Sequence, residues 1–179
     1  GKTVRSRTFK TAEIRTLAFH PDGNRLAAAS RDRLAAVWDL ATDEIAWQSS
    51  DPALPLWDVA WSPDGKTLAV THNDGTVVLH DALGGMARHQ FGVITREYPV
   101  RLSFAPDGKR LAVAAAHKVL KLFEVPTGRT VLDLRRDPAV AGAVAFDPTG
   151  RILAGGQIDG TIILWPTTDA LVAHDDSAH

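Results

Sequence analysis

The chain has 179 residues, of which 45% are hydrophobic and 23% are charged, and its formal net charge is −1. This near-neutral balance argues against nucleic acid as a partner, because binding to phosphates needs a concentrated excess of positive charge, and we expect none. The sequence has no cysteine, so disulfides and thiolate chemistry are excluded. Its apolar runs are far shorter than the roughly 20 residues of a membrane-spanning helix, and we expect no membrane partner.

The first residue and the composition bear on the source and location of the protein. Gly1 stands where a gene product has methionine, and no signal peptide is visible. We therefore expect that residues before Gly1 are missing and that the protein is cytoplasmic. Arginine outnumbers lysine and alanine is abundant, which favours a bacterial source.

One sequence pattern occurs four times along the chain. It begins with an aromatic-x-Pro-x-Gly turn, and the four prolines, spaced 42, 43 and 42 residues apart, are Pro21, Pro63, Pro106 and Pro148. A Trp-Asp-like pair follows each proline after 17 residues, as Trp38-Asp39, His80-Asp81, Phe123-Glu124 and Trp165-Pro166. A fixed period of this length predicts a repeat architecture, in which one unit is too small to bury its own apolar face.

Each repeat is predicted to form four short strands, and none shows a helical period. In chain order the predicted strands are 14–19, 26–29, 34–38 and 44–48; 56–61, 67–70, 76–80 and 86–91; 102–104, 111–115, 119–123 and 129–134; and 144–146, 152–154, 161–165 and 170–174. The first three strands of a unit are almost entirely apolar, so both of their faces must be covered. The fourth is polar enough to be an outer edge. Asp74-Gly75 between the second and third strands of the second unit favours a primed hairpin turn.

A four-stranded antiparallel meander packed between copies of itself is a β-propeller blade. The repeats resemble those of WD-repeat β-propellers over residues 1 to about 174, through the Pro-x-Gly turns, the Asp-Gly-Thr runs and the fixed step to Trp38 and Trp165. The W-S-P-D-G-K run taken singly also resembles TolB-like propellers. The resemblance implies an all-β fold of four four-stranded blades. The Gly-His pair that usually precedes the first strand in this family is absent from all four copies, so we expect apolar packing to replace a buried polar relay.

Four blades form only part of a typical ring, because WD-repeat propellers usually have seven or more. The predicted units are 1–10, an outer strand of a preceding or closing blade; 11–50, 51–93, 94–136 and 137–174, the four blades; and 175–179, a tail. Residues 1–7 are predicted to pair outside the first blade. Two assemblies remain open: a piece of a longer propeller, completed by a complementary fragment, or a homodimer that closes an eight-bladed ring with twofold symmetry. In both, exposed blade faces must find another protein surface.

The sequence contains no pattern that predicts catalysis. It has no Gly-rich phosphate loop and no G-x-S-x-G elbow, and its histidines lack close metal-ligand spacing. Asp22, Asp64 and Asp107 recur at one turn position, which indicates side-chain bonding to the turn backbone. We predict no enzyme activity, no cofactor and no metal site.

Residues that differ between repeats on one face are the candidate binding residues. Alternate loops of a meander lie at the same end, so the loops between second and third strands share a face with the segments leading into each first strand. The predicted partner-binding residues are Arg31, Arg33, Trp57, His72, Asn73, Arg96, Tyr98, His117 and Ile158. The predicted core residues are Trp38, Trp61, His80, Phe104, Phe123, Phe146 and Trp165. Aromatic residues and arginine are typical of contact surfaces.

The predicted function is that of a non-catalytic scaffold that binds a protein or peptide. The alternative is a regulatory or substrate-gating propeller, similar to TolB-like propellers, attached to an enzyme domain outside this chain.

Overall fold

The computed structural model describes residues 5–9, 13–50, 55–92, 100–115, 119–134, 143–157 and 159–167. These residues form fifteen strands joined by turns, which confirms the all-β fold. The first unit contains β1 (Ile14–Phe19), β2 (Arg25–Ser30), β3 (Leu34–Asp39) and β4 (Glu44–Ser50). The second contains β5 (Leu56–Trp61), β6 (Thr67–His72), β7 (Thr76–Asp81) and β8 (Ala87–Gly92). The third contains β9 (Val100–Phe104), β10 (Arg110–Ala115), β11 (Val119–Glu124) and β12 (Thr130–Asp133), and the fourth β13 (Ala143–Phe146), β14 (Ile152–Gly156) and β15 (Ile162–Pro166).

Each unit is an antiparallel meander, as expected for propeller blades. Three sheets have four strands in chain order, and the described part of the fourth sheet has three. The fourth strand predicted over residues 170–174 lies outside the described residues. None of the described segments forms an apolar helix of membrane-spanning length.

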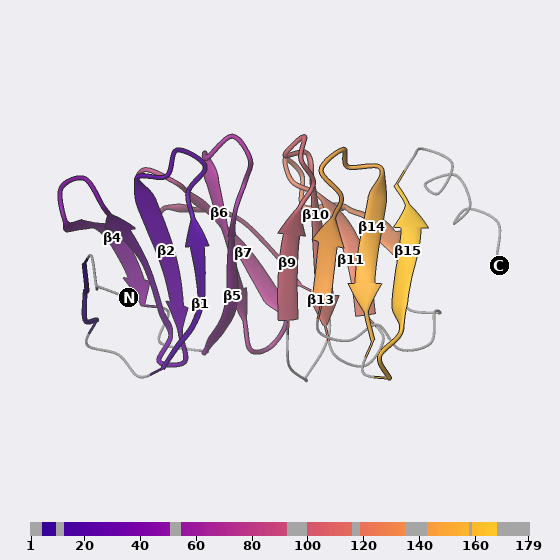
Figure 1. Ribbon diagram of the computed structural model, residues 1–179, viewed down its shortest axis with the longest axis horizontal. Helices are drawn as coiled ribbons and strands as arrows, with labels where there is room; N and C mark the ends of the chain where they lie inside the picture. The colour runs from indigo at the N-terminus through magenta and orange to yellow at the C-terminus, as the bar shows by residue number, and fades with distance from the viewer. Residues whose placement is uncertain are drawn as a thin grey trace.

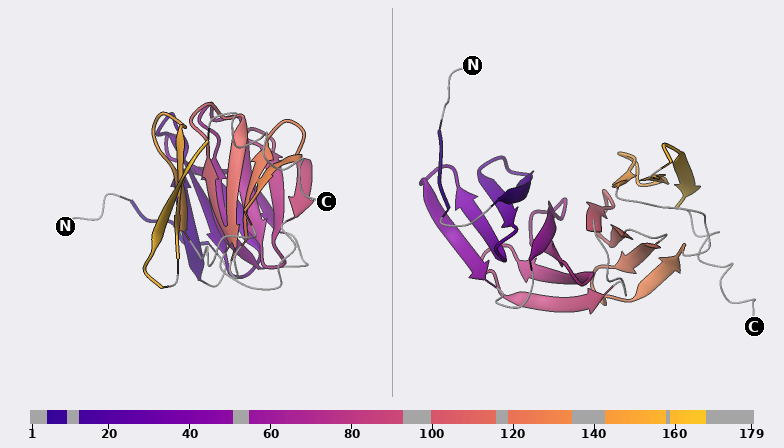
Figure 2. Two further views of the ribbon diagram at one scale, coloured as in Figure 1. Left: turned by 90° about the vertical axis from the view of Figure 1, so that its right-hand side faces the viewer. Right: turned by 90° about the horizontal axis from the view of Figure 1, so that it is seen from below.

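The four blades stand side by side in an open arc (Figures 1 and 2). The first strands β1, β5, β9 and β13 contact one another in that order. They line the concave side, whereas β4, β8 and β12 lie on the convex side (Figure 2, right). The first and fourth blades lie at opposite ends of the arc, so in the described part of the chain one side of each has no neighbouring blade (Figure 1).

Part of the N-terminal segment lies beside the first blade. Residues 5–9 form no strand. The guanidinium groups of Arg5 and Arg7 instead donate hydrogen bonds to the carbonyl oxygens of Leu40 and Asp43, in the turn between β3 and β4. Residues 5–9 therefore lie against the first blade, and the pairing predicted for residues 1–7, of which 1–4 are outside the described ranges, stays a prediction. The arginine side chains direct residues 5–9 to the first blade, because they satisfy turn carbonyls of the nearest sheet.

Apolar clusters between neighbouring blades form the core. Val37 of the first blade packs with Val59 and Trp61 of the second, and Leu79 of the second packs with Leu102 of the third. A third cluster joins the third and fourth blades. Full burial of one such side chain contributes about 1.5–3 kcal/mol, so packing between blades stabilises the arc. Among the predicted core residues, Trp38, Trp61, His80, Phe123 and Trp165 are buried, and Phe104 and Phe146 are half-buried.

The Pro-x-Gly turns share one geometry. In the first, the Gly23 N–H donates to the His20 carbonyl at 2.9 Å, and Gly23 has a φ of 75°. Asp22 accepts a hydrogen bond from the backbone N–H two residues later, as do the equivalent Asp64 and Asp107. The structural role predicted for these aspartates is confirmed.

The turn between β6 and β7 is different from the predicted one. Gly75 has a φ of 84°, whereas Asp74 is not among the residues with positive φ. The Gly75 N–H donates to the His72 carbonyl at 3.1 Å. A type I′ turn needs positive φ at both central residues and a type II′ turn needs it at the first, so this is instead a three-residue loop that ends in a left-handed glycine.

Candidate interaction surface

Two opposite faces of the arc are formed by turns. We call the surface formed by the Pro-x-Gly turns and the turns before each fourth strand the turn face. The surface formed by the turns between second and third strands, with the segments leading into the first strands, is the loop face. The turn face lies at the top of Figure 1 and the loop face at the bottom.

Five of the nine predicted binding residues lie in the described part of the chain. Arg31 and Arg33 are exposed in the turn between β2 and β3, and Trp57 and Asn73 are half-buried. Arg96, Tyr98, His117 and Ile158 lie outside the described residues.

His72 is only 5% exposed, so most of its side chain lies beneath the loop face, and its contact with a partner stays a prediction. Strand β6 continues through His72, which pairs with Leu56 of β5. Because the pairing continues to this residue, the imidazole lies beneath the loop face.

Arg33 and His72 line the same cleft between the first and second blades. The cleft has a volume of about 180 Å³, and its wall also includes Ser49, Leu56 and His80. His80 Nδ1 donates to the Gly85 carbonyl at 2.9 Å, and burial lowers the pKa of this imidazole. The cleft therefore has a neutral histidine at its wall and an arginine at its loop-face side.

Arg33 has an unusual backbone conformation. Its φ is 70°, in the left-handed region, and the equivalent residues of the second and fourth blades are Gly75 and Gly160, with φ values of 84° and 87°. Glycine takes this conformation freely, whereas other residues do so at a cost of about 1–2 kcal/mol. Strain of this kind is often found where a side chain is needed for function.

Trp57 is held by a cation. The Arg15 guanidinium lies 3.9 Å from the centre of the Trp57 ring, and Arg15 Nη1 donates to the Leu56 carbonyl at 3.2 Å. Arg15 and Trp57 occupy equivalent positions in β1 and β5. The pair therefore joins the inner strands of two blades and fixes the orientation of the indole, as cation–π contacts do. The prediction did not include Arg15, since its contact with Trp57 depends on how two blades align.

Asp58 has a structural role between the blades that the sequence analysis did not predict. Its Oδ1 accepts from Thr16 Oγ1 of the first blade at 2.9 Å and from the Val59 N–H at 3.0 Å. Its Oδ2 accepts from the Leu102 N–H of the third blade at 3.0 Å, and Arg101 Nη1 lies 3.9 Å from Oδ1. One carboxylate thus bridges the inner strands of three blades.

The environment of Asp58 raises its pKa. Burial is the largest cause, and it outweighs the hydrogen bonds from Leu102 and Thr16 and the charge of Arg101, which favour the ionised form. A signal was present in the sequence, because Thr16, Asp58 and Arg101 are equivalent positions filled by three different polar residues.

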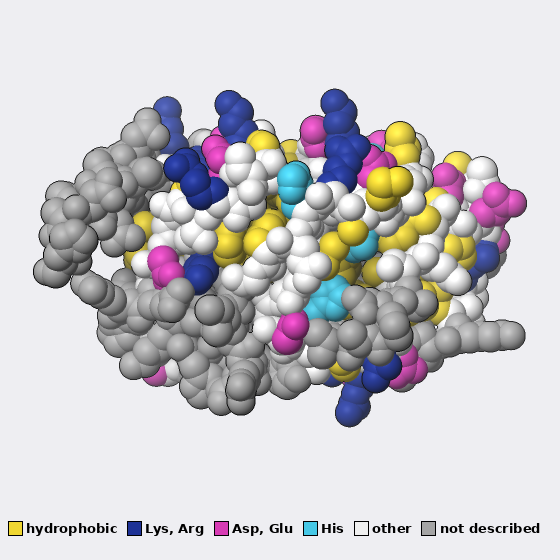
Figure 3. Space-filling view, turned by 180° about the vertical axis from the view of Figure 1, so that it is seen from behind, with side chains coloured by type: hydrophobic (Ala, Val, Ile, Leu, Met, Phe, Trp, Pro, Cys, Tyr) yellow, Lys and Arg dark blue, Asp and Glu magenta, His cyan; other side chains and the backbone are white. Residues whose placement is uncertain are grey.

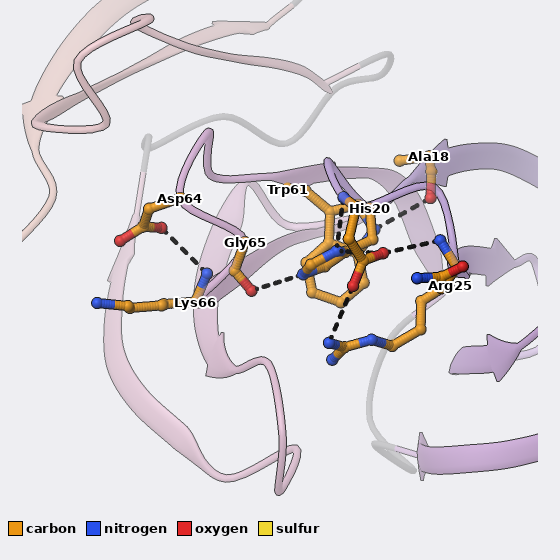
Figure 4. A network of polar contacts seen from close by, with 9 residues as sticks. Ala18, His20, Arg25, Trp61, Asp64, Gly65 and Lys66 are labelled. Atoms are coloured by element: carbon orange, nitrogen blue, oxygen red, sulfur yellow. Dashed lines mark hydrogen bonds and ion pairs between the residues drawn. The ribbon is translucent and has the colours of Figure 1, made fainter.

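A network of polar contacts joins the Pro-x-Gly turns of the first two blades on the turn face (Figure 4). His20 is buried and donates from Nε2 to the Gly65 carbonyl at 2.9 Å, while its Nδ1 lies 2.8 Å from Asp22 Oδ1. The imidazole meets the Trp61 ring edge-on at 4.7 Å, and Trp61 Nε1 donates to the Ala18 carbonyl at 3.0 Å. These contacts serve the packing of blades.

The turn face also has mixed charge. Lys and Arg side chains project from this edge with Asp and Glu beside them (Figure 3). Arg88 pairs with Asp81, and Arg25 pairs with Asp22. Opposite charges placed alternately do not make a concentrated positive field. Within the described ranges, no group of three or more His, Asp or Glu residues is arranged to hold a metal ion.

Fold and surface together define the class of protein: an arc of β-propeller blades with a repeated turn face and a variable loop face. The family model described as "WD domain, G-beta repeat" matches residues 1–39 and 137–166. The model described as "Anaphase-promoting complex subunit 4 WD40 domain" matches residues 31–100. The chain belongs to the WD-repeat family, as its repeats predicted.

Curated relatives are similar over most of this chain. It is 28% identical to WD repeat-containing protein SL1-17 of Schistosoma mansoni over 151 residues, which cover 82% of this chain and 48% of the relative. It is 29% identical to a WD repeat-containing protein of Synechocystis sp. over 146 residues, or 81% of this chain and 41% of the relative. It is 27% identical to the Retinoblastoma-binding protein 5 homolog of Drosophila melanogaster over 153 residues, or 83% and 30%. The chain thus spans less than half the length of these relatives.

Proposed function

We propose that this chain is a non-catalytic scaffold that binds a protein or peptide on its loop face. The observation that carries the proposal is Arg33, an exposed arginine in a left-handed conformation where two other blades have glycine. Glycine would relieve the backbone strain at this position, so the chain carries an arginine here at a cost in backbone energy.

The contrast between the two faces also supports the loop face as the binding surface. The turn face repeats from blade to blade, with Asp22, Asp64 and Asp107 in one role. Equivalent loop-face positions differ, as Arg31 and Asn73 do. Recognition of a specific partner needs a surface whose side chains differ from blade to blade, and the loop face has such side chains.

The chemistry of the loop face suits a protein partner. Arginine and tryptophan are the residues most enriched in binding hot spots, and the surface offers Arg31, Arg33 and a Trp57 ring held by Arg15. The name of one relative, Retinoblastoma-binding protein 5 homolog, refers to a protein target, and the name of another, a Gallus gallus component of Chromatin assembly factor 1, refers to an assembly. These two names support a protein or peptide as the class of partner.

Selection from a library of random peptides displayed on phage tests this proposal. Peptides enriched on the wild-type chain are assayed by fluorescence anisotropy against two double variants. The loop-face variant is Arg31→Ala with Arg33→Ala. The matched control is Lys66→Ala with Arg88→Ala, which also removes two exposed cations but from the turn face.

We expect the loop-face variant to bind the selected peptides at least about tenfold more weakly, a loss of about 1.4 kcal/mol, and the control to bind as the wild type does. Peptide binding that survives the loop-face changes but is lost in the control would contradict the proposal.

A further inference from the structure

The cleft between the first and second blades is open because its side chains are smaller than those at the next interface. Ser49 of β4 and His80 of β7 line the cleft from the two blades. The equivalent residues one repeat later are Phe91 and Phe123, whose rings pack with their centroids 4.4 Å apart. The two phenylalanines therefore occupy, between the second and third blades, the space that stays open between the first and second.

A second pair of positions shows the same difference. Val78 and Gln90 stand opposite each other on β7 and β8, and both line the cleft. Their equivalents in the third blade are Lys121 and Asp133, which also stand opposite each other. Lys121 is only 7% exposed, and its Nζ lies 3.5 Å from Asp133 Oδ2. The cleft is thus a feature of one interface and does not follow from the repeat.

The cleft combines a buried apolar part with an accessible polar part. We call the buried part the floor, which is at most 2% exposed and includes Ala35, Leu56 and Val70. The accessible part is the rim, which includes Arg33, Ser49 and Gln90. The guanidinium, hydroxyl and amide groups of the rim can all donate hydrogen bonds. An occupant that fits both parts has a short apolar stem and a group that accepts hydrogen bonds.

The charge of the cleft favours an anion. Arg33 is a permanent cation, and none of the described residues that line the cleft is Asp or Glu. Asp32, the acid next to Arg33 in the turn, is not part of the wall. His80 adds no positive charge at neutral pH, because burial lowers its pKa. One guanidinium matches one carboxylate, and this pair can form two parallel hydrogen bonds.

The volume of the cleft limits the size of what it can hold. About 180 Å³ is available, which is roughly six times the share of one molecule in liquid water. A glutamate side chain, with two methylene groups and a carboxylate, is of this size. Its methylene groups suit the apolar floor and its carboxylate suits the rim.

We propose that this cleft binds a glutamate side chain of the peptide held on the loop face, with its carboxylate against Arg33. Arg33 belongs to the loop-face turn between β2 and β3, so a peptide on that face lies at the mouth of the cleft. The inference rests on the proposed function and adds the chemistry of the partner, an acidic side chain. It also gives the left-handed arginine a use, because Gly75 and Gly160 at the equivalent positions have no charge to offer.

The peptides selected on the wild-type chain test the inference in a double-mutant cycle. We expect them to share a glutamate, and its replacement by glutamine to weaken binding to the wild type about tenfold. The same peptide change should have little effect on the Arg33→Gln chain, because the matching charge is already gone. Arg31→Gln is the matched control, since it removes an exposed arginine of the same turn that does not line the cleft, and it should keep the full effect.

Ser49→Phe fills the cleft without changing any charge, because it places there the side chain that the second blade has at position 91. We expect it to weaken the glutamate peptide and to leave the affinity for the glutamine peptide nearly unchanged. Arg33→Lys keeps the positive charge and should retain most of the preference for glutamate.

Butyrate, a carboxylate on a short aliphatic chain, tests the cleft without any peptide. Titration at constant pH and ionic strength, followed by NMR, should shift the imidazole signals of His72 and His80, which line the cleft. Neutral butyramide, of the same size, should bind at least about fivefold more weakly. Equal binding of the two compounds, or no shift with butyrate, would overturn the inference.

The outcomes separate this inference from the proposed function. Peptides that need the loop-face arginines but share no glutamate would overturn the inference and leave the loop-face proposal intact. So would a Glu→Gln change in the peptide that costs the same affinity in the wild type and in Arg33→Gln. Peptide binding that survives the double loop-face variant would contradict the proposed function itself, whatever butyrate does.

Discussion

At the scale of single residues, the buried Asp58 links three blades, whereas the recurrent turn aspartates accept hydrogen bonds within their own turns. Asp58 accepts hydrogen bonds from the backbone N–H groups of Val59 and Leu102 and from the Thr16 hydroxyl. These donors belong to three blades, and two of them are backbone groups that cannot turn toward water. Removing the carboxylate is therefore expected to affect how β1, β5 and β9 align with one another.

We expect Asp58→Ala to lower the free energy of unfolding by about 2–4 kcal/mol, because each buried donor without a partner costs about 1–3 kcal/mol. Urea denaturation measures the loss. Thr16→Val, which removes one donor and keeps the acceptor satisfied by the other two, is the comparison and should cost about 1 kcal/mol. Equal losses for the two variants would show that Asp58 does not bridge the blades.

His80 couples stability to pH. Burial lowers its pKa below the ordinary histidine value, so the unfolded chain takes up this proton at a higher pH than the folded chain does. The contribution of His80 to stability is therefore present above the ordinary value, about 6.5, and is lost as the pH falls through the lowered pKa of the folded state.

His80→Phe should reduce the loss of melting temperature between about pH 7 and about pH 5, because phenylalanine does not titrate and already fills the equivalent position 123. The comparison is the wild-type chain, measured over the same pH range. Thermal melts followed by circular dichroism across this range check both. An unchanged pH dependence in His80→Phe would contradict the assignment.

At the scale of elements, the strands follow from sequence patterns, whereas their ends and turns depend on contacts. The strand predicted over residues 67–70 extends to His72 in the structure. Its last two residues, Thr71 and His72, are polar and resemble a turn, yet they pair with Asp58 and Leu56 of β5. The extra pairing explains both the error at the strand end and the burial of His72.

The turn between β2 and β3 gives a prediction at this scale. We expect Arg33→Gly to raise the free energy of unfolding by about 0.5–1 kcal/mol, because glycine relieves the left-handed strain but also gains freedom in the unfolded chain. Arg31→Gly, in the same turn but outside the residues with positive φ, should lower stability instead. Urea midpoints of the two variants decide the matter, and a destabilised Arg33→Gly variant would mean that the strain is compensated elsewhere.

At the scale of the whole molecule, the period of the sequence predicts four blades, and the structure confirms the propeller-type fold. The polar bridge at Asp58 and the pairing of Arg15 with Trp57 could not be predicted, because each joins strands about one repeat apart. Such contacts depend on how far neighbouring blades are shifted along the direction of their strands, and a repeat pattern does not specify this shift. The binding roles of all nine predicted residues stay predictions, and four of the nine lie outside the described ranges.

The most direct test of a binding role for the loop face is hydrogen exchange of the chain with and without a peptide selected on it. We expect slower exchange at the loop-face amides, in residues 31–33 and 73–75, which lie in the turns between second and third strands. The amides of residues 22–24 and 64–66 on the turn face should exchange at the same rate in both samples. Protection confined to the turn face would contradict a binding role for the loop face.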